Sequence, residues 1–291
     1  MRVLLISAYD WAHVGDSLAK CLKAADVEAK AISLMEHPLL PDNNLVPVKE
    51  VAEWEDWADV VIAMHSEPVK LGKPTFVFHG GSRYRNDHKE LNKFWNGNAL
   101  ASFIQTQDLF GLGAENEIEL PAPVDTGLVH MHGRSEGDTK FGHFPSNALK
   151  GSDVVNYAFY KVSTRHPVDY VYDPNRTEWK DHIGRMANVD VVIESCGVGA
   201  GWGVNGAEAA ALGRIVIGRL TRQEEYEEEF GPCEMVVAND YHELRGKIES
   251  LFYLSRKEIK EKQMATREWI DKYHSFKATG TRMKRIMEGL I

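Results

Sequence analysis

Short apolar runs of strand length alternate with segments of helical periodicity along most of the chain. The first run, at residues 3–7, is followed by a polar loop and by an amphipathic segment at 17–25. A helix is also predicted at 48–57, because Pro47 is tolerated at the head of a helix but not inside one. The further strands expected in this half are residues 29–33, 60–64, 75–78 and 102–105. Such alternation predicts βαβ units and a doubly wound parallel sheet.

The same alternation returns in the second half of the chain. Strands are expected at residues 141–145, 168–172, 189–194, 214–218 and 234–237, and helices at 152–161, 178–186 and 205–212. Residues 240–291 have a helical pattern. Between the halves, residues 121–139 hold prolines, glycines and charges without periodicity, which is typical of a linker.

These patterns predict an α/β protein with two Rossmann-like domains, a cleft between them and a C-terminal helical segment. We expect an N-terminal domain at residues 1–125, a linker at 126–139 and a C-terminal domain at 140–270. The last helix, 271–291, is in a position to pack back on the N-terminal domain. The length of 291 residues supports two domains, since it exceeds what one hydrophobic core usually serves.

Composition narrows the class of protein. Apolar residues make up 43% of the chain and charged residues 26%, as in an ordinary soluble globular protein. The net charge of −9 argues against sequence-independent nucleic-acid binding, which depends on Lys and Arg. Five glutamates between 224 and 229 favour a solvated helix face or loop. Without a signal peptide or an apolar run long enough to span a bilayer, the protein is expected to be cytoplasmic.

The motifs of several common enzyme classes are absent from the sequence. It contains no GxSxG, HExxH or Walker A motif. Cys21, Cys196 and Cys233 are too widely spaced for a disulfide framework or a CxxC metal site, and His130 and His132 lack a metal-ligand pattern. We therefore expect no required metal.

The densest signal for chemistry lies at residues 189–218, where a strand, a glycine-rich turn, an Ala-rich helix and another strand follow one another. Glycines let a backbone approach a ligand closely, and the unpaired amides at the start of a helix attract phosphate. The segment therefore predicts a diphosphate site near Val204, with a loop that needs positive φ angles as the alternative. Glu208 can bind ribose hydroxyls there. It can equally be a capping-box glutamate for a helix that begins at Asn205.

The stretch from Trp202 to Ile217 resembles the donor motif of GT-B glycosyltransferases, in particular the retaining group related to glycogen and lipopolysaccharide glycosyl transferases (group 1, family 4-like). The shared features are an aromatic-Gly segment, a Glu-Ala pair, a small-residue helix, a Gly and a strand. The resemblance implies that Glu208 holds the donor ribose. It also implies that the amides from Gly203 through Val204 to Asn205 hold the diphosphate.

A second segment of the chain, His143 to Lys150 followed by Gly151, resembles the first strand-loop-helix of the same donor domain. The resemblance implies that Lys150 binds the diphosphate, a role that suits a compact ammonium beside a departing anion. Ser146 and Asn147, in the loop before it, are further donor-binding candidates. A solvated lysine before a helix is the structural alternative.

In the N-terminal half, His79 follows a strand and resembles the histidine that lies near the donor sugar in these transferases. It is the third catalytic candidate beside Lys150 and Glu208, with a structural histidine as its alternative. Gly15 matches the small residue that lets donor phosphate and acceptor meet. The remaining candidates, for acceptor contacts, are His13, Asp16 and Arg83.

The sequence also departs from the family pattern at two places. The acidic residue usual eight positions before Glu208 is replaced by Ala200, and the arginine that often precedes the lysine is missing. The resemblance covers most of the chain in its order of strands and helices, but only the two motifs of the C-terminal domain are specific to the family.

Together these residues predict a glycosyltransferase that moves a sugar from a nucleoside-diphosphate sugar to a hydroxyl acceptor, with retention implied by the resemblance. The acceptor classes left open are a glycan, a lipid-linked glycan, a small molecule and modified DNA. No cofactor is expected beyond the donor substrate. The alternatives are a nucleotide-sugar 2-epimerase and a non-catalytic nucleotide-sugar-binding module, the latter favoured by Ala200.

Overall fold

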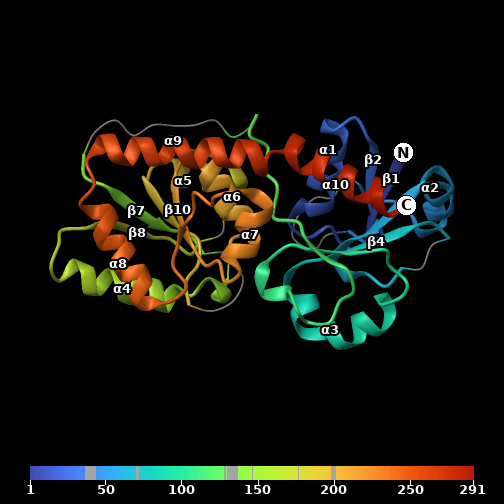
Figure 1. The fold of residues 1–291 in the computed structure, drawn as a ribbon, viewed down its shortest axis with the longest axis horizontal. Helices are drawn as coiled ribbons and strands as arrows, with labels where there is room; N and C mark the ends of the chain where they lie inside the picture. The colour runs from blue at the N-terminus through green and yellow to red at the C-terminus, as the bar shows by residue number, and fades with distance from the viewer. Residues whose placement is uncertain are drawn as a thin grey trace. The chain divides into compact units, whose positions relative to one another are not determined.

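The computed structural model of the chain describes residues 1–36, 44–69, 72–127, 129, 137–145, 147–175, 177–197 and 201–291. The described chain divides into two compact units (Figure 1). Unit 1 consists of Met1–Pro123 with His274–Ile291, and unit 2 consists of Val124–Tyr273. The C-terminal segment therefore belongs to the same unit as the N-terminus.

Within the described residues, unit 1 contains a six-stranded parallel sheet with the strand order β2-β1-β3-β4-β5-β6. The strands are β1 (Arg2–Ser7), β2 (Glu28–Ser33), β3 (Val60–Ala63), β4 (Thr75–His79), β5 (Ser102–Ile104) and β6 (Glu117–Glu119). Successive residues of β1 point to opposite faces of the sheet, so Val3 and Leu5 join one buried cluster while Leu4 and Ile6 join another. Burial on both faces explains why this strand is an unbroken apolar run in the sequence.

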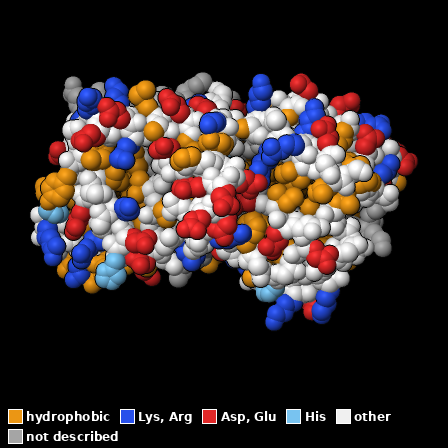
Figure 2. Space-filling view, viewed as in Figure 1, with side chains coloured by type: hydrophobic (Ala, Val, Ile, Leu, Met, Phe, Trp, Pro, Cys, Tyr) orange, Lys and Arg blue, Asp and Glu red, His pale blue; other side chains and the backbone are white. Residues whose placement is uncertain are grey.

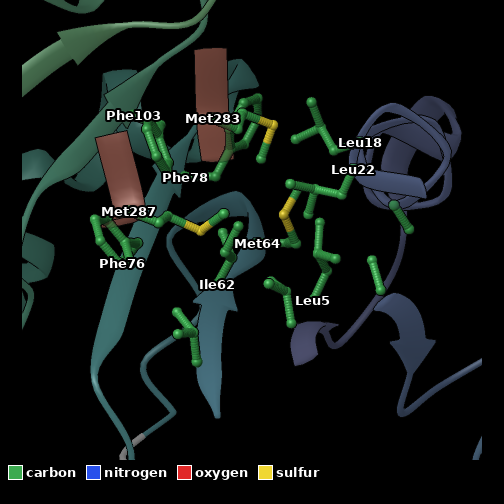
Figure 3. Packing of buried hydrophobic residues seen from close by; sticks show 14 of the residues in the cluster. Leu5, Leu18, Leu22, Ile62, Met64, Phe76, Phe78, Phe103, Met283 and Met287 are labelled. Carbon is green, nitrogen blue, oxygen red and sulfur yellow. The ribbon is translucent and has the colours of Figure 1, made fainter. Parts of the chain in front are cut away.

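The helices of unit 1 include one from the very end of the chain. They are η1 (Trp11–His13), α1 (Val14–Ala24), η2 (Val48–Glu50), α2 (Val51–Trp57), η3 (Met64–Ser66), α3 (Gly81–Trp95), η4 (Gln107–Leu109) and α10 (Phe276–Leu290). Helix α10 packs against α1, and Gly280 allows the close approach, because a Cβ there would overlap the carbonyl oxygen of Cys21. Figure 3 shows Met283 and Met287 of α10 among the buried side chains of this unit, which include Phe76.

Unit 2 has a parallel sheet with the order β11-β10-β9-β7-β8 among its described residues. Its strands are β7 (Lys140–His143), β8 (Asp169–Tyr172), β9 (Val191–Ile193), β10 (Ile215–Gly218) and β11 (Val236–Val237). Its helices are η5 (Ala148–Lys150), α4 (Ser152–Ser163), α5 (Trp179–Ala187), α6 (Val204–Ala211), α7 (Gln223–Phe230), α8 (Tyr241–Phe252) and α9 (Arg256–Tyr273). Buried residues of α4 and α8 pack on one face of the sheet, and those of α6 pack on the other, together with Trp269 and Ile270 of α9.

The strand order of each sheet determines where a ligand can bind to it. When strands are numbered within each unit, the first five strands of both sheets have the order 2-1-3-4-5. The connections that leave the first and third strands therefore run to opposite sides, which opens a crevice outside the carboxyl ends of these two neighbours. In unit 1 this position lies at the ends of β1 and β3, and in unit 2 at the ends of β7 and β9.

The predicted α/β class with two parallel sheets is confirmed, with differences in individual elements. The pattern predicts neither β6 nor α3, although Tyr84, Leu91 and Trp95 lie on one face of α3, because most of the residues of this helix are polar or charged. Residues 48–50 form the 3-10 turn η2, and the chain becomes α-helical only from Val51.

Part of the segment expected as a linker is packed onto unit 2. Val124 and Val129 join a buried cluster of this unit. The Arg267 guanidinium of α9 donates hydrogen bonds to the carbonyl oxygens of Thr126 and Val129, each at 2.8 Å. Unit 2 thus begins before the residue at which composition places the second domain, and residues 130–136 lie outside the described part of the chain.

The glutamate-rich segment is helix α7. Tyr226 and Phe230, one helical turn apart, are buried, while most of the glutamates around them are exposed. Figure 2 shows acidic side chains gathered over this helix, so the prediction of a solvated helix face is confirmed. Among the described residues, no helix is long and apolar enough to cross a membrane, and no group of His, Cys, Asp and Glu side chains could hold a metal ion.

Candidate functional site

Three segments of unit 2 meet at the carboxyl ends of β7 and β9. Lys150 ends the turn η5 that follows β7, Glu194 comes directly after β9, and Gly203 precedes α6. A Cβ built on Gly203 would lie 4.0 Å from Lys150 Nζ and 3.7 Å from Glu194 Oε1. The two segments that resemble a donor site in the sequence are therefore side by side at the position that the topology marks.

The backbone beside Lys150 is held tightly against the loop after β9. The Cys196 amide donates a hydrogen bond to the Lys150 carbonyl oxygen at 3.2 Å. Gly151 has a φ of 69°, and a Cβ there would overlap the Cys196 carbonyl oxygen. Only glycine fits this place without strain, so the Lys-Gly pair is required for the lysine to reach the loop.

Glu194 is the residue on which these groups converge, and it is not among the candidates predicted from the sequence. Its side chain is fully buried, and its Oε1 accepts hydrogen bonds from Lys150 Nζ and from the Gly203 amide, the latter at 3.1 Å. Its Oε2 accepts from Asn205 Nδ2 at 2.7 Å. The available signal was a carboxylate directly between an apolar strand and a glycine-rich turn.

Helix α6 presents its N-terminus at the same place. Its N-cap is Gly203, which offers no side chain to the first amides, and those of Val204, Asn205 and Gly206 have no acceptor within the helix. Gly203, Val204 and Asn205 are all partly exposed. Amides at the start of a helix with an ammonium nearby are groups of the kind that bind anions, and here Glu194 balances their positive charge.

Glu208 lies one turn further along α6. Its Oε1 accepts a hydrogen bond from Trp179 Nε1 at 2.6 Å. Burial raises the pKa of the Glu208 carboxyl to about 7, and the nearby Glu194 charge acts in the same direction, although the bond from Trp179 opposes both. The capping-box alternative is wrong: the N-cap is Gly203, and the Asn205 side chain is bound to Glu194 rather than to the helix amides.

Neighbouring side chains hold the site in place. His182 Nε2 donates to Asn205 Oδ1 at 2.5 Å, which fixes the amide orientation in which Asn205 donates to Glu194. His143 is fully buried, donates through Nδ1 to the Ile193 carbonyl oxygen at 2.8 Å and contacts Ser152 Oγ at 3.0 Å. Burial lowers the pKa of His143, so it ties β7 to β9 as a neutral imidazole.

Of the other two candidates of the lysine loop, Asn147 is the one that the structure describes. Asn147 Oδ1 accepts from the Leu149 amide at 2.9 Å and so supports the η5 turn. Ser146 lies outside the described residues, as does Ala200.

In unit 1, a cavity of about 640 Å³ opens at the carboxyl ends of β1, β3 and β4. Arg83 lines it, and its guanidinium donates to Glu67 at 2.7 Å; the role of Arg83 as an acceptor contact stays a prediction. The histidine that lines it is His65, whereas His79 is fully buried. His79 lies 2.8 Å from Ser66 Oγ through Nδ1, and burial lowers its pKa to about 3. This environment fits the structural alternative for His79.

The remaining candidates of unit 1 surround Asp10, which the sequence analysis also misses. The Asp10 carboxylate accepts hydrogen bonds from the amides of Gly15 at 2.7 Å and Asp16 at 2.9 Å, and His65 Nε2 lies 3.5 Å away. Burial raises the pKa of Asp10, but these hydrogen bonds outweigh it and leave the pKa below its usual value. The Asp16 side chain pairs with Lys20, and His13 stands at the N-cap of α1 with a φ of 51°.

Comparison with known proteins gives a structural match but no sequence match. No protein-family model matches the chain, and no curated protein resembles it in sequence. Its structure is similar to that of HepE from Anabaena in complex with UDP and glucose, with a TM-score of 0.67, 12% identity and 100% of both chains covered. It is also similar to sucrose-phosphate synthase from Thermosynechococcus elongatus, with a TM-score of 0.64, 12% identity and 100% and 99% of the chains covered. A glycosyltransferase from Rickettsia africae matches with a TM-score of 0.60, 13% identity and 99% and 98% coverage. The chain therefore has the two-domain GT-B fold of these glycosyltransferases, as the sequence predicts.

Proposed function

We propose that this protein is a glycosyltransferase that takes its sugar from a nucleoside-diphosphate donor bound at the head of α6. The observation that carries the proposal is the meeting of Lys150 with Gly203 and the first amides of α6, which have no acceptor within the helix, at the switch point of the second sheet. A diphosphate needs both a cation and directed donors, and this position supplies them.

The chemistry follows from those groups. In the reaction, the bond between the anomeric carbon and the diphosphate oxygen breaks, and a bond forms between that carbon and the acceptor oxygen. The acceptor proton passes to the departing diphosphate. Lys150 and the amides of Val204 and Asn205 stabilise the negative charge that grows on the diphosphate, which is electrostatic rather than covalent catalysis. Retention of configuration is part of the proposal.

Glu194 and Glu208 have different roles in this proposal. Glu194 orients Lys150 and Asn205, because its carboxylate accepts hydrogen bonds from Lys150, Gly203 and Asn205, which surround the proposed phosphate position. Glu208 accepts hydrogen bonds from the ribose hydroxyls, and Trp179 fixes its carboxylate for that purpose. The raised pKa of Glu208 means that donor affinity rises with its ionisation, between about pH 6 and pH 8.

The donor to test first is a uridine-diphosphate sugar. Two of the similar structures are HepE in complex with UDP and with UDP-glucose. The proposal extends this class of ligand to the present chain, and it requires no metal ion for turnover.

A thermal-shift panel of uridine, guanosine and adenosine diphosphates with their sugars tests the donor site. A ligand at 100 times its dissociation constant adds about 2.7 kcal/mol of stability to the folded chain. We expect a shift with at least one nucleotide, unchanged by a metal chelator. If no nucleotide raises the melting temperature, the donor-site assignment is wrong.

Product analysis separates transfer from the two alternatives. A 2-epimerase would convert the donor without any acceptor. A non-catalytic module would bind the nucleotide and consume no donor across an acceptor panel. Acceptor-dependent release of nucleoside diphosphate is the outcome that the proposal predicts.

A further inference from the structure

Unit 2 has a second cavity, of about 630 Å³, at the open edge of its sheet. This β11 cavity is lined by β11 and the residues beside it, by one face of α8, and by Lys262 of α9. Strand β11 is the last strand of the sheet among the described residues. The lining residues differ from those around Lys150 and Glu194, and the volume falls within the range of small-molecule sites.

The backbone of β11 presents an unpaired amide to this cavity. Successive residues of an edge strand direct their N–H and C=O groups alternately toward the neighbouring strand and away from it. The Ala238 amide donates to the Gly218 carbonyl oxygen of β10 at 2.9 Å, so the groups of Val237 and Asn239 point outward. The Asn239 amide is bound by the Glu243 carboxylate at 2.7 Å. The Val237 amide has no acceptor in the part of the chain that the structure describes.

Helix α8 places an ammonium beside that open amide. The helix runs back along β11, and its buried residues pack against Val236 of this strand. One helical turn of four residues advances about 6 Å, and two strand residues advance about 6.6 Å, so the two elements keep step. Glu243 binds the Asn239 amide, and one turn later Lys247 reaches the level of Val237. The first position pairs an amide with a carboxylate, whereas the second brings an amide and an ammonium together.

The charges of the lining favour an anionic ligand. Two lysines and one glutamate are the charged side chains that line the β11 cavity. Neither Lys247 nor Lys262 has an ion pair or a side-chain hydrogen bond with a described residue, whereas the Glu243 carboxylate is bound to the backbone. The amides at the start of α8 are capped by Asp240, and the glutamates of α7 lie outside the lining. The excess charge of the cavity is therefore positive.

The wall beyond Lys247 is apolar. Met235 and Leu251 are buried beneath the cavity, and Leu254 is partly exposed to it. Both leucines follow Lys247 along α8, toward the end of the helix that carries a partial negative charge. An anionic group is thus favoured beside Lys247, and a hydrocarbon group is favoured beside Leu254.

We infer that the β11 cavity binds a carboxylate carried on an aliphatic body. The carboxylate accepts from the Val237 amide and from Lys247, as the Glu243 carboxylate accepts from the next outward amide, and the aliphatic part packs on Leu251 and Leu254. A free aliphatic acid and the C-terminus of a peptide both carry this group. The inference does not depend on the donor site.

Isothermal titration calorimetry with the full chain tests the inference. The two probes are sodium octanoate and N-acetyl-leucylleucine, and acetate and 1-octanol represent the head group and the chain alone. Lys247→Met is compared with Lys260→Met, which removes an exposed lysine of α9 outside the lining. Val237→Pro removes the outward amide, a change that an edge strand accommodates, and Val237→Ala keeps it. The melting temperature of each variant, with and without UDP, reports separately on folding and on the donor site.

We expect octanoate or the dipeptide to bind at least about tenfold more tightly than acetate and 1-octanol, and the tighter of the two identifies the source of the carboxylate. Lys247→Met weakens that binding about tenfold, as loss of a charged hydrogen-bond partner does, and Lys260→Met changes it less than about threefold. Val237→Pro weakens it more than Val237→Ala.

Three results overturn the inference: neither probe binds, 1-octanol binds as tightly as octanoate, or Lys247→Met and Lys260→Met have the same effect. If Val237→Pro does not fold, the comparison of the lysine variants decides. The UDP-induced thermal shift is the same in all folded variants, and its absence in the wild-type chain counts against the donor site alone.

Discussion

The ion pair between Lys150 and Glu194 either serves the fold alone or also takes part in ligand binding. Substitutions at these two residues distinguish the two roles. The Lys150 side chain is 9% exposed and that of Glu194 is fully buried. Removing one partner of such a pair leaves an uncompensated buried charge, which costs about 3–5 kcal/mol, whereas replacing both partners is often close to neutral. Because Gly203 and Asn205 still donate to Glu194, we expect the lower end of this range for Lys150→Met, about 3 kcal/mol.

A double-mutant cycle measures both properties of the pair. Lys150→Met and Glu194→Gln each lower the free energy of unfolding by about 3 kcal/mol, and the double variant loses only about 1 kcal/mol. In a unit of this size, a loss of 3 kcal/mol lowers the melting temperature by roughly 6–12 °C. Affinity for UDP behaves differently, because the ammonium is absent from the double variant as well. It falls at least about tenfold in both Lys150→Met and the double variant.

The assays are urea unfolding for stability and isothermal titration calorimetry with UDP for affinity. Lys260→Met, at an exposed position of α9, is the control for loss of a lysine charge in the same unit, and it changes neither quantity appreciably. If the double variant recovers stability and also binds UDP like the wild type, Lys150 serves the fold alone and our reasoning about the donor site is refuted.

Three further predictions concern the pH dependence of folding and the helix contacts. Because the folded-state pKa of Glu208, about 7, lies above the unfolded value, the free energy of unfolding falls as pH rises from about 4.5 to 7. Glu208→Gln removes this fall, which amounts to about 2 kcal/mol. If chemical unfolding gives the wild type and this variant the same dependence of stability on pH, the raised pKa of Glu208 is contradicted. His79 has a folded-state pKa of about 3, so the stability it contributes above pH 6.5 is lost as pH falls towards 3. In this pH range the free energy of unfolding of His79→Gln depends less on pH than that of the wild type. A stronger dependence would contradict a buried neutral imidazole at His79. In α10, Gly280→Ala lowers the melting temperature because its Cβ meets the Cys21 carbonyl, whereas Gly289→Ala, with open space around it, raises it slightly. Equal effects of the two substitutions would show that α1 and α10 are not closely packed.

The order of elements could be predicted from the sequence where burial leaves a clear pattern. Residues 3–6 and 191–193 are apolar because both faces of a parallel sheet are covered, and this signal is local. Helix α3 is hard to predict because it is mostly polar and charged, and its buried face consists of a few widely spaced side chains, Tyr84, Leu91 and Trp95 among them.

The candidate site was predicted in part, and the missing part depends on contacts distant in sequence. The Lys150 and Gly203 segments were identified, whereas Glu194, which binds both, was not, because its role exists only once β7 and β9 are paired. The same holds for Asp10 and His65, which approach each other because β1 and β3 are neighbours. For Glu208 the sequence leaves a ribose-binding role and a helix-capping role open, and the N-cap of α6, Gly203, excludes the capping role.

The central claim is that the head of α6 and Lys150 together bind a diphosphate, and a crystal structure of the chain with bound UDP tests it most directly. The account predicts phosphate oxygens about 3 Å from the amides of Val204 and Asn205 and from Lys150 Nζ. A structure with the diphosphate elsewhere, and with the α6 amides in contact with solvent alone, would contradict it.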